Sequence, residues 1–331
     1  MKVAVDAMGG DYAPQEIVKG AIQAARNGKI EIILVGSEDV IYREMAKHDV
    51  SHLPIRVVNA SEVIKDGESP VAALHHKPDA SVPVAMRLVK EGKADAVVSM
   101  GHTGMVMVSA IETLGRLPGI KRPSIGAILH GLAPNTVVLD MGANVDCKPR
   151  DLLSFATIGC VVARRMLHIT NPTVALLSNG TEEGKGNKIV KEAYQLFKSS
   201  NLNFIGNVEG NDIPRGRANV IVCDGFTGNV LIKFSEGLGD LIIERLKITL
   251  DKRLSNEELD AISDDLFALT HIADISGGGL IYGVDGVAWI GHGRSKAPQL
   301  AEAIRQAKLA VETNLVQELK AELEKVKKDE G

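Results

Sequence analysis

The chain has 331 residues, of which 45% are hydrophobic and 24% are charged, and its formal net charge is -4. This balance is typical of a globular protein with a sizeable core and excludes a disordered or fibrous chain. Aromatic residues make up only 3% of the chain, which is too few to favour a surface on which nucleic-acid bases stack. We therefore expect no nucleic-acid partner.

The three cysteines are an odd number without CxxC spacing, which indicates neither a disulfide framework nor a zinc site. The N-terminus opens into an apolar run without a charged leader, and no apolar run approaches the length that crosses a bilayer. We expect a soluble, cytoplasmic protein without a bound metal.

Short apolar runs rich in β-branched residues alternate with amphipathic stretches. Strands are expected over residues 3–5, 30–35, 55–58, 96–99, 136–140, 174–177, 204–208 and 220–223. Helices are expected after Pro14, after Asp79, over 103–117, over 151–168, from after Gly228 to about Leu250, and over 297–326. The alternation predicts an α/β fold with a mostly parallel sheet covered by helices on both faces.

No linker interrupts the chain, so residues 1–331 are expected to form a single α/β domain. Two helical excursions, near 62–91 and 251–274, leave the strand alternation. The second has an apolar face and an acidic face, whereas a membrane-surface helix usually carries a basic one. This favours packing on the protein itself or on a partner subunit; contact with a membrane surface is the alternative.

Glycine-containing loops follow three of the expected strands. They read Asp6-Ala7-Met8-Gly9-Gly10-Asp11, Ser99-Met100-Gly101-His102-Thr103-Gly104 and Asp224-Gly225-Phe226-Thr227-Gly228-Asn229. In open α/β sheets, ligands bind outside the carboxyl ends of the strands, where such loops lie. A helix cap or tight turn explains any one loop equally well, but three of them together favour a ligand site on one side of one sheet.

A further run, residues 178–186, combines glycines with Asn179, Glu182, Glu183 and Lys185 and suits an anion, although it is not a Walker loop. No GxGxxG or GxSxG motif supports a dinucleotide enzyme or an α/β-hydrolase. Cys223 is interpreted as a core residue because its neighbour Asp224 would raise a thiol pKa.

These motifs, together with Asp140-Met141-Gly142-Ala143-Asn144, Gly277-Gly278-Gly279 and His292-Gly293, resemble in content and order the bacterial phosphate acyltransferase family. The resemblance implies a three-layer α/β/α fold like that of isocitrate dehydrogenase and phosphotransacetylase. It implies transfer of a long-chain fatty acyl group from acyl carrier protein to inorganic phosphate, without a cofactor. It also implies a homodimer, peripheral membrane contact, and a downstream glycerol-3-phosphate acyltransferase that uses the acyl phosphate in phospholipid synthesis.

The site residues expected for this chemistry fall into three groups. Lys185, Asn229 and His292 are the catalytic candidates, with Asn229 as a donor to the oxyanion and Lys185 or His292 as the acid for the departing thiolate. The phosphate-binding candidates are Ser99, Gly101, His102, Thr103, Gly104 and Arg294. Supporting positions in the site loops are Asp6, Gly9, Gly10, Asp11, Asp140, Asn144, Glu183, Asp224, Gly225 and Gly228.

Three alternatives stay open. One is a phosphotransacetylase-like enzyme that uses acyl-CoA; the second is a non-catalytic scaffold that contacts a membrane or partner through residues 251–274. The third, a metal-dependent decarboxylating dehydrogenase, rests on fold analogy alone. A carrier-protein substrate needs a basic surface, for which the candidates are Arg215, Arg217, Lys247, Lys252 and Arg253.

Overall fold

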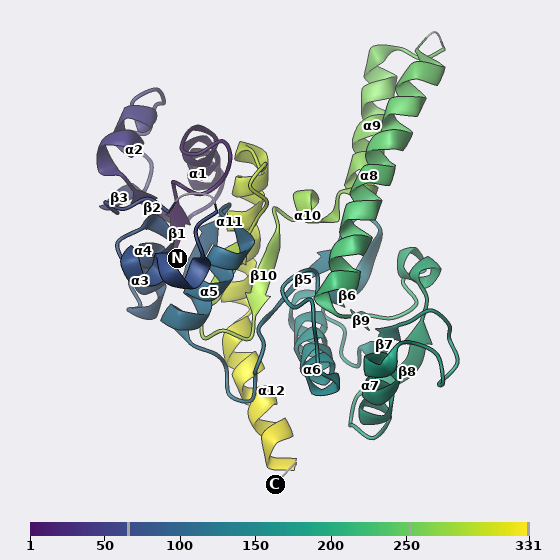
Figure 1. Cartoon of the computed structure of the whole chain (residues 1–331). Helices are drawn as coiled ribbons and strands as arrows, with labels where there is room; N and C mark the ends of the chain where they lie inside the picture. Colours follow the sequence, from purple (N-terminus) through teal and green to yellow (C-terminus); the bar gives the residue numbers. More distant parts are fainter. Residues whose placement is uncertain (65–66, 252, 330–331) are drawn as a thin grey trace. The chain divides into compact units, whose positions relative to one another are not determined.

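The computed structural model describes residues 1–64, 67–251 and 253–329. The contacts within the chain divide it into two compact units. Unit 1 comprises Met1–Ile125 and Ser276–Gly331, and unit 2 comprises Gly126–Ile275. Each unit has its own strands and helices (Figure 1). That the whole chain acts as a single domain stays a prediction.

Unit 1 contains six strands in the spatial order β3-β2-β1-β4-β11-β10. Their bounds are β1 Lys2–Asp6, β2 Glu31–Gly36, β3 Ile55–Asn59, β4 Ala96–Ser99, β10 Gly279–Tyr282 and β11 Val287–Ile290. Neighbouring strands are parallel except β10, which runs antiparallel to β11. The helices are α1 Gln15–Asn27, α2 Glu38–Met45, α3 Pro70–His76, α4 Ser81–Lys90, α5 Thr103–Leu114, α11 Ala297–Glu312 and α12 Leu315–Asp329.

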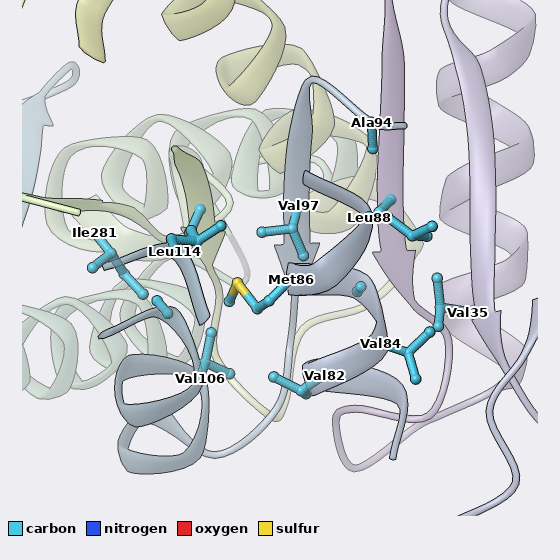
Figure 2. Close-up of a cluster of buried hydrophobic side chains, with 14 of the residues drawn as sticks. Val35, Val82, Val84, Met86, Leu88, Ala94, Val97, Val106, Leu114 and Ile281 are labelled. Carbon is cyan, nitrogen blue, oxygen red and sulfur yellow. The ribbon is translucent and has the colours of Figure 1, made fainter. Parts of the chain in front are cut away.

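The core of unit 1 follows from the alternation of side chains along its strands. Ala4, Val35 and Val97 point to one face, where they pack against α4 and α5 (Figure 2). Their neighbours Val3 and Val5 point to the opposite face and are fully buried. On that face α1 packs against α11. The sheet of unit 1 is thus the middle layer of three.

The strands of unit 2 have the spatial order β5-β6-β9-β7-β8, and the first two residues of β5 belong to unit 1 in the division of the sequence. Their bounds are β5 Ser124–Leu129, β6 Ala133–Leu139, β7 Thr173–Leu177, β8 Asn203–Val208 and β9 Val220–Val222. Among the strands described in unit 2, β5 pairs antiparallel with β6, and the other neighbouring strands are parallel. The helices are α6 Pro149–Met166, α7 Lys188–Lys198, the 3-10 helix η1 Gly210–Arg215, α8 Gly225–Leu250, α9 Asn256–Thr270 and α10 Ile272–Ile275.

Helix α6 lies directly against the sheet of unit 2 and buries Phe155 and Ile158 completely. The close approach depends on Gly159, because a β-carbon there would lie 2.4 Å from Val220 Cγ1. A side chain of any size at this position would push α6 away from β9.

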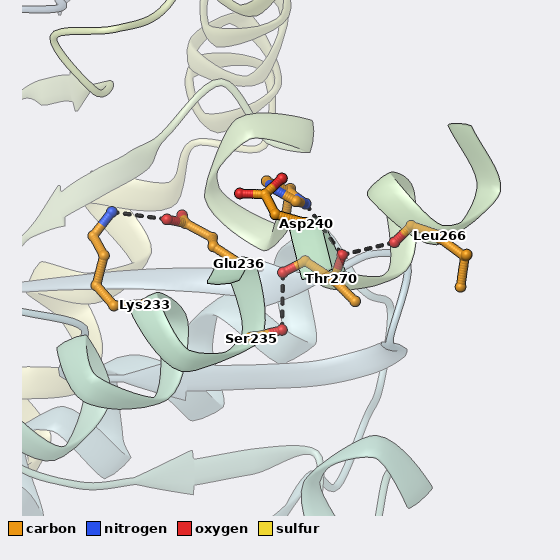
Figure 3. A network of polar contacts seen from close by, with 7 residues as sticks. Lys233, Ser235, Glu236, Asp240, Leu266 and Thr270 are labelled. Atoms are coloured by element: carbon orange, nitrogen blue, oxygen red, sulfur yellow. Dashed lines mark hydrogen bonds and ion pairs between the residues drawn. The ribbon is translucent and has the colours of Figure 1, made fainter. Parts of the chain in front are cut away.

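Helices α8 and α9 form a long antiparallel hairpin within unit 2 (Figure 1). At its base, Ser235 Oγ donates a hydrogen bond to the Thr270 carbonyl at 2.8 Å, and Thr270 Oγ1 donates to the Leu266 carbonyl at 2.7 Å (Figure 3). A β-carbon on Gly239 would lie 2.1 Å from Thr270 Oγ1. Glycine at this position therefore sets how closely the two helices meet.

The predicted α/β fold with a mostly parallel sheet is confirmed, and each expected strand overlaps an observed one. Three strands were not predicted: β5, β10 and β11. The single helix expected over 297–326 is wrong, because Asn314 adopts φ 51° and separates α11 from α12. A left-handed residue cannot continue a right-handed helix. The described parts of both excursions contain helices, α3 and α4 in the first and α9 in the second; residues 65–66 and 252 lie outside the described residues.

Candidate active site

Three neighbouring parallel strands of unit 1, β1, β4 and β11, end at the same edge of its sheet. The loops that follow them contain residues 6–11, 99–104 and 291–296. Two of the three glycine loops singled out in the sequence therefore lie together in unit 1, next to the His292 loop. The third glycine loop belongs to unit 2.

A buried carboxylate joins the first two loops. Ser99 Oγ donates a hydrogen bond to Asp6 Oδ2 at 2.6 Å and accepts one from the Gly101 N–H at 3.0 Å. The Ser81 hydroxyl also binds Asp6. Burial nevertheless raises the pKa of Asp6 above its ordinary value, with the hydrogen bonds from Ser81, Ser99, Met8 and Gly9 opposing the shift. Because the Ser99 side chain is fully buried in this contact, the geometry favours a role for Ser99 in shaping the loop.

Glycine is required where these loops meet. A β-carbon on Gly9 would lie 2.2 Å from Asp6 Oδ2 and 3.0 Å from the Gly101 nitrogen, and Gly10 has φ +107°. The Asp11 N–H donates to the Gly293 carbonyl at 2.8 Å, which ties the first loop to the late one. The structure thus brings together the predicted positions Gly9, Gly10 and Asp11 with the loop that contains His292.

The second loop leads into the start of α5. His102 is its N-cap residue and Thr103 its first residue, and both side chains are exposed. The first N–H groups of a helix lack partners within it and carry partial positive charge, which suits an anion. Arg294 is exposed and His292 partly exposed in the neighbouring late loop. Lys296 in the same loop lies over the Tyr12 ring, 5.6 Å from its centroid.

Unit 2 has a corresponding arrangement. Its neighbouring parallel strands β6, β9 and β7 end at one edge. The loops that follow contain residues 140–148, 223–224 with the start of α8, and 178–187. They contain the remaining candidates: Asp140, Asn144, Glu183, Lys185, Asp224, Gly225, Gly228 and Asn229.

Asp140 organises the loop after β6 and is fully buried. Its Oδ1 accepts hydrogen bonds from the N–H groups of Gly142 and Ala143 at 3.1 and 3.0 Å. Its Oδ2 accepts from the Asn144 N–H at 2.9 Å and from Asn144 Nδ2 at 2.6 Å. Four N–H donors therefore surround one carboxylate, which supports a structural role for both Asp140 and Asn144.

The start of α8 is packed tightly onto this loop. Asp224 caps the helix by accepting a hydrogen bond from the Thr227 N–H at 2.7 Å. A β-carbon would lie 2.7 Å from Asn144 backbone atoms if placed on Gly225, and 1.9 Å from the Asp140 carbonyl oxygen if placed on Gly228. Both glycines are thus needed for close contact. Asn229 follows on the exposed first turn of α8, beside Gly142.

The loop after β7 positions Lys185 and separates it from Glu183. Gly180 makes room for the Lys185 stem, because a β-carbon there would lie 2.7 Å from Lys185 Cγ. Among the described residues the exposed Lys185 ammonium forms no ion pair. Glu183 instead binds Lys198 at 3.0 Å and Gln195 at 3.0 Å, both on α7. These contacts lower the Glu183 pKa, with the Gln195 hydrogen bond as the largest cause, and hold Glu183 to α7.

The two cysteines beside Asp140 are not activated nucleophiles. Burial, with the charge of Asp140 as the next cause, raises the pKa of Cys147 to about 12 and that of Cys223 well above its ordinary value. Both side chains are thiols at neutral pH. The interpretation of Cys223 as a core residue agrees with its membership of a buried apolar cluster.

Two hydroxyl groups at these edges were given no role in the sequence analysis. Ser81, at the start of α4, contributes to the Asp6 cluster from 75 residues away in the chain. Ser178 follows β7 and begins the run 178–186, and its buried Oγ has no hydrogen-bond partner among the described residues. No local pattern marks Ser81, whereas the glycine-containing run includes Ser178.

No helix in the described part of the chain is both long and apolar enough to cross a membrane. Residues 1–318 match the family described as "Fatty acid synthesis protein". The chain is 45% identical to the phosphate acyltransferase of Thermosynechococcus vestitus, covering 97% of this chain and 94% of the relative. It is 47% identical to that of Heliobacterium modesticaldum, covering 96% of each.

Among solved structures, the fold is similar to that of the EutD phosphotransacetylase from Staphylococcus aureus. The TM-score is 0.59 at 18% identity, covering 93% of this chain and 94% of the other. This likeness concerns the fold alone. The family match and the full-length relatives go further: the chain belongs to the fatty acid synthesis protein family and is an acyltransferase related over nearly its whole length to the phosphate acyltransferases.

Proposed function

We propose that the enzyme transfers a long-chain fatty acyl group from acyl carrier protein to inorganic phosphate, giving acyl phosphate and the free carrier thiol. The observation that carries this proposal is the anion-suited start of α5, held in place by the Asp6–Ser99 contact at 2.6 Å. The protonated state of Cys147 and Cys223 supports direct transfer without an acyl-enzyme intermediate.

In the proposed reaction a phosphate oxygen attacks the thioester carbonyl carbon, and a C–O bond forms as the carbonyl becomes a tetrahedral oxyanion. The C–S bond then breaks, and the carrier leaves as a thiolate that takes up a proton. A thioester is already activated and phosphate is an anion at neutral pH, so the chain's own residues need only position the reactants and manage charge.

The residues of each unit have separate proposed roles in this reaction. In unit 1, the N–H groups of residues 102–104 bind phosphate together with the side chains of His102, Thr103 and Arg294, while the Gly101 N–H binds Ser99 Oγ. In unit 2, the Asn229 amide donates to the oxyanion. Lys185 adds positive charge, and Lys185 or His292 supplies the proton to the thiolate. The buried carboxylates Asp6 and Asp140 shape the loops around these groups.

The deciding experiment follows release of carrier thiol from palmitoyl-acyl carrier protein with and without phosphate, while mass spectrometry detects palmitoyl phosphate. Release that depends on phosphate, with that product, is the expected result. Palmitoyl-CoA is the second donor in the same assay. Faster phosphate-dependent turnover with palmitoyl-CoA than with the carrier would instead identify a phosphotransacetylase-like enzyme, and no turnover with either would leave a scaffold role.

The carrier protein is acidic, so its docking needs basic residues that are not already paired. Arg215 and Arg217 are exposed and lie at the end of η1. Lys247, by contrast, binds Asp260 at 3.2 Å, and Lys252 lies outside the described residues. We expect Arg217→Glu to raise KM for the acyl carrier protein without changing KM for phosphate. Arg253→Glu provides a comparison on the hairpin.

A homodimer is proposed to form through α8, which exposes a stripe of large apolar side chains at four-residue spacing: Phe226, Val230, Phe234 and Leu238, continued by Ile242. Phe234 is 68% exposed. Stripes of this kind usually mark protein interfaces. Sedimentation should show a dimer that Phe234→Glu dissociates, and Tyr42→Glu on α2 serves as the exposed control.

Peripheral membrane association is the other use of this hairpin. Flotation with anionic vesicles tests it directly: a wild-type dimer that floats supports membrane contact, and one that stays at the bottom removes it. In either case the acyl phosphate product must pass to an enzyme that accepts an activated acyl group, which we propose is a glycerol-3-phosphate acyltransferase.

A further inference from the structure

A cavity of about 330 Å³ lies in unit 1 against α5, the helix that follows the proposed phosphate loop. It is formed by α3, the Pro78 turn, α4 and α5, and its lining residues are Val71, Leu74, His75, Pro78, Pro83, Arg87, Val108, Glu112 and Thr113. Its volume falls in the range of about 300–1,000 Å³ that is usual for small-molecule sites. No residue of this cavity has a role in the chemistry described above.

One face of α5 leads from the phosphate loop to the cavity. Gly104, Val108 and Glu112 are spaced by four residues, so they lie on the same side of the helix. Gly104 faces α3, since a β-carbon there would lie 3.4 Å from Pro70 Cγ. Val108 follows one turn later and lines the cavity. The path from Gly104 to Glu112 is about 12 Å long at 1.5 Å per residue.

The chemistry of the lining selects an apolar occupant. Valine, leucine and proline side chains contribute the surface nearest α3 and α4. Arg87, the cationic side chain of the lining that is charged at every physiological pH, already donates to the Pro78 carbonyl and binds Asp79 at 2.8 Å. Its charge is therefore satisfied by neighbouring residues, which disfavours an anion in the cavity. A flexible hydrocarbon gains about 0.8 kcal/mol for each methylene group that it buries.

We propose that this cavity binds the hydrocarbon chain of the fatty acyl donor, starting from the thioester end at the phosphate loop. The proposal rests on the proposed function and extends it to how the enzyme selects long acyl chains. The α3–α5 face would hold the part of the chain beyond its first few carbons, and the exposed rim at His75 and Glu112 would let longer chains continue outward.

The first test measures binding without turnover. The full-length protein is titrated with the fluorescent fatty acid cis-parinaric acid, and Val108→Trp fills the cavity with a larger side chain. We expect the Kd of Val108→Trp for cis-parinaric acid to rise on the order of tenfold, because roughly two methylene groups of the ligand are no longer buried. Val40→Trp, a partly buried valine on α2, is the matched control and should bind as the wild type does. Equal binding by Val108→Trp and the wild type would overturn the proposal.

The second test uses chain length. Val71→Glu places a charge at a cavity residue that is 55% exposed, so the fold should tolerate it if Val108→Trp does not fold. Both variants should raise KM for palmitoyl-acyl carrier protein and leave KM for butyryl-acyl carrier protein unchanged. A rise that is equal for both chain lengths would contradict a hydrocarbon site. If the wild type shows no phosphate-dependent turnover, the proposed function fails, while the parinaric acid titration still decides the cavity.

Discussion

The Asp6 cluster of unit 1 and the Asp140 cluster of unit 2 perform the same task with different donors. Each is built on a fully or almost fully buried carboxylate that follows a parallel strand. Asp6 receives two of its hydrogen bonds from the hydroxyls of Ser81 and Ser99. Asp140 instead accepts hydrogen bonds from four N–H groups, three of them on the backbone.

The difference decides what each cluster tolerates. A hydroxyl rotates and can either donate or accept, whereas an N–H can only donate. The Asp140 site therefore requires an acceptor at both oxygens, and the Asp6 site can adapt to a changed partner. We conclude that unit 2 holds its loop with fixed N–H donors, while unit 1 holds its loop with groups that can rearrange.

The largest effect is expected when each buried carboxylate, Asp140 or Asp6, is replaced separately by asparagine. Asp140→Asn turns an NH₂ group toward fixed N–H donors and should lower the free energy of unfolding by about 3 kcal/mol, because buried donors lose their acceptor. Asp6→Asn should cost about 1 kcal/mol, because Ser81 or Ser99 can rotate to accept. Denaturant unfolding measures both, with the exposed Asp146→Asn as control. Equal losses at the two sites would contradict the comparison.

The second-largest effect is expected on kcat, from a substitution in unit 2. Asn229 is exposed on the first turn of α8, so Asn229→Ala should leave stability unchanged and lower kcat about a hundredfold, as expected for one donor to an oxyanion. Phosphate-dependent thiol release gives kcat and KM separately. A folded variant with normal kcat would remove Asn229 from the chemistry.

The third-largest effect is expected on KM for phosphate, from a substitution in unit 1. Thr103→Val removes a hydroxyl from the start of α5 and should raise KM for phosphate about tenfold, with little change in kcat. Thr313→Val is the matched control, because the Thr313 hydroxyl bonds only within its own helix. An unchanged KM for phosphate would place the phosphate elsewhere.

The smallest effect is a pH dependence specific to Asp6. Burial raises its pKa in the folded state, so the folded protein binds a proton more readily than the unfolded chain does. The contribution of Asp6 to stability is therefore complete below its unfolded pKa, about 3.9, and is lost as pH rises through the folded pKa. The stability of the wild type relative to Asp6→Asn should therefore fall as pH rises above the unfolded pKa. A relative stability that rises over this range would show the opposite shift.

Much of the fold could be predicted because its long parallel strands and amphipathic helices carry local patterns. The missed strands β10 and β11 are no shorter than the predicted strands β4 and β9. Glycines at both ends of each missed strand instead make its apolar run resemble part of a turn. β11 pairs with β4 across about 190 residues, and periodicity contains no information about such a partner. The break at Asn314 was missed because the residues on both sides continue the apolar pattern of a helix.

For the site, the sequence could predict which loops follow strands but not how their side chains pair. Ser99 was expected to contact phosphate, yet its hydroxyl binds Asp6 from 93 residues away. Glu183 was expected among the site loops, and α7 holds it through Lys198 and Gln195. Such pairings depend on the three-dimensional register of the sheet. The assignments of phosphate and oxyanion ligands stay predictions.

Unit 1 is built from both ends of the chain, with all of unit 2 between them. During translation, β4 emerges long before β11, its neighbour in the finished sheet. At about 5–20 residues per second, the roughly 150 residues of unit 2 delay β11 by about 8–30 s. Throughout this interval an apolar strand edge lacks its partner. The nascent chain is therefore most prone to aggregate in the interval between the synthesis of β4 and the synthesis of β11. Unit 2 is the part that can complete its folding on the ribosome.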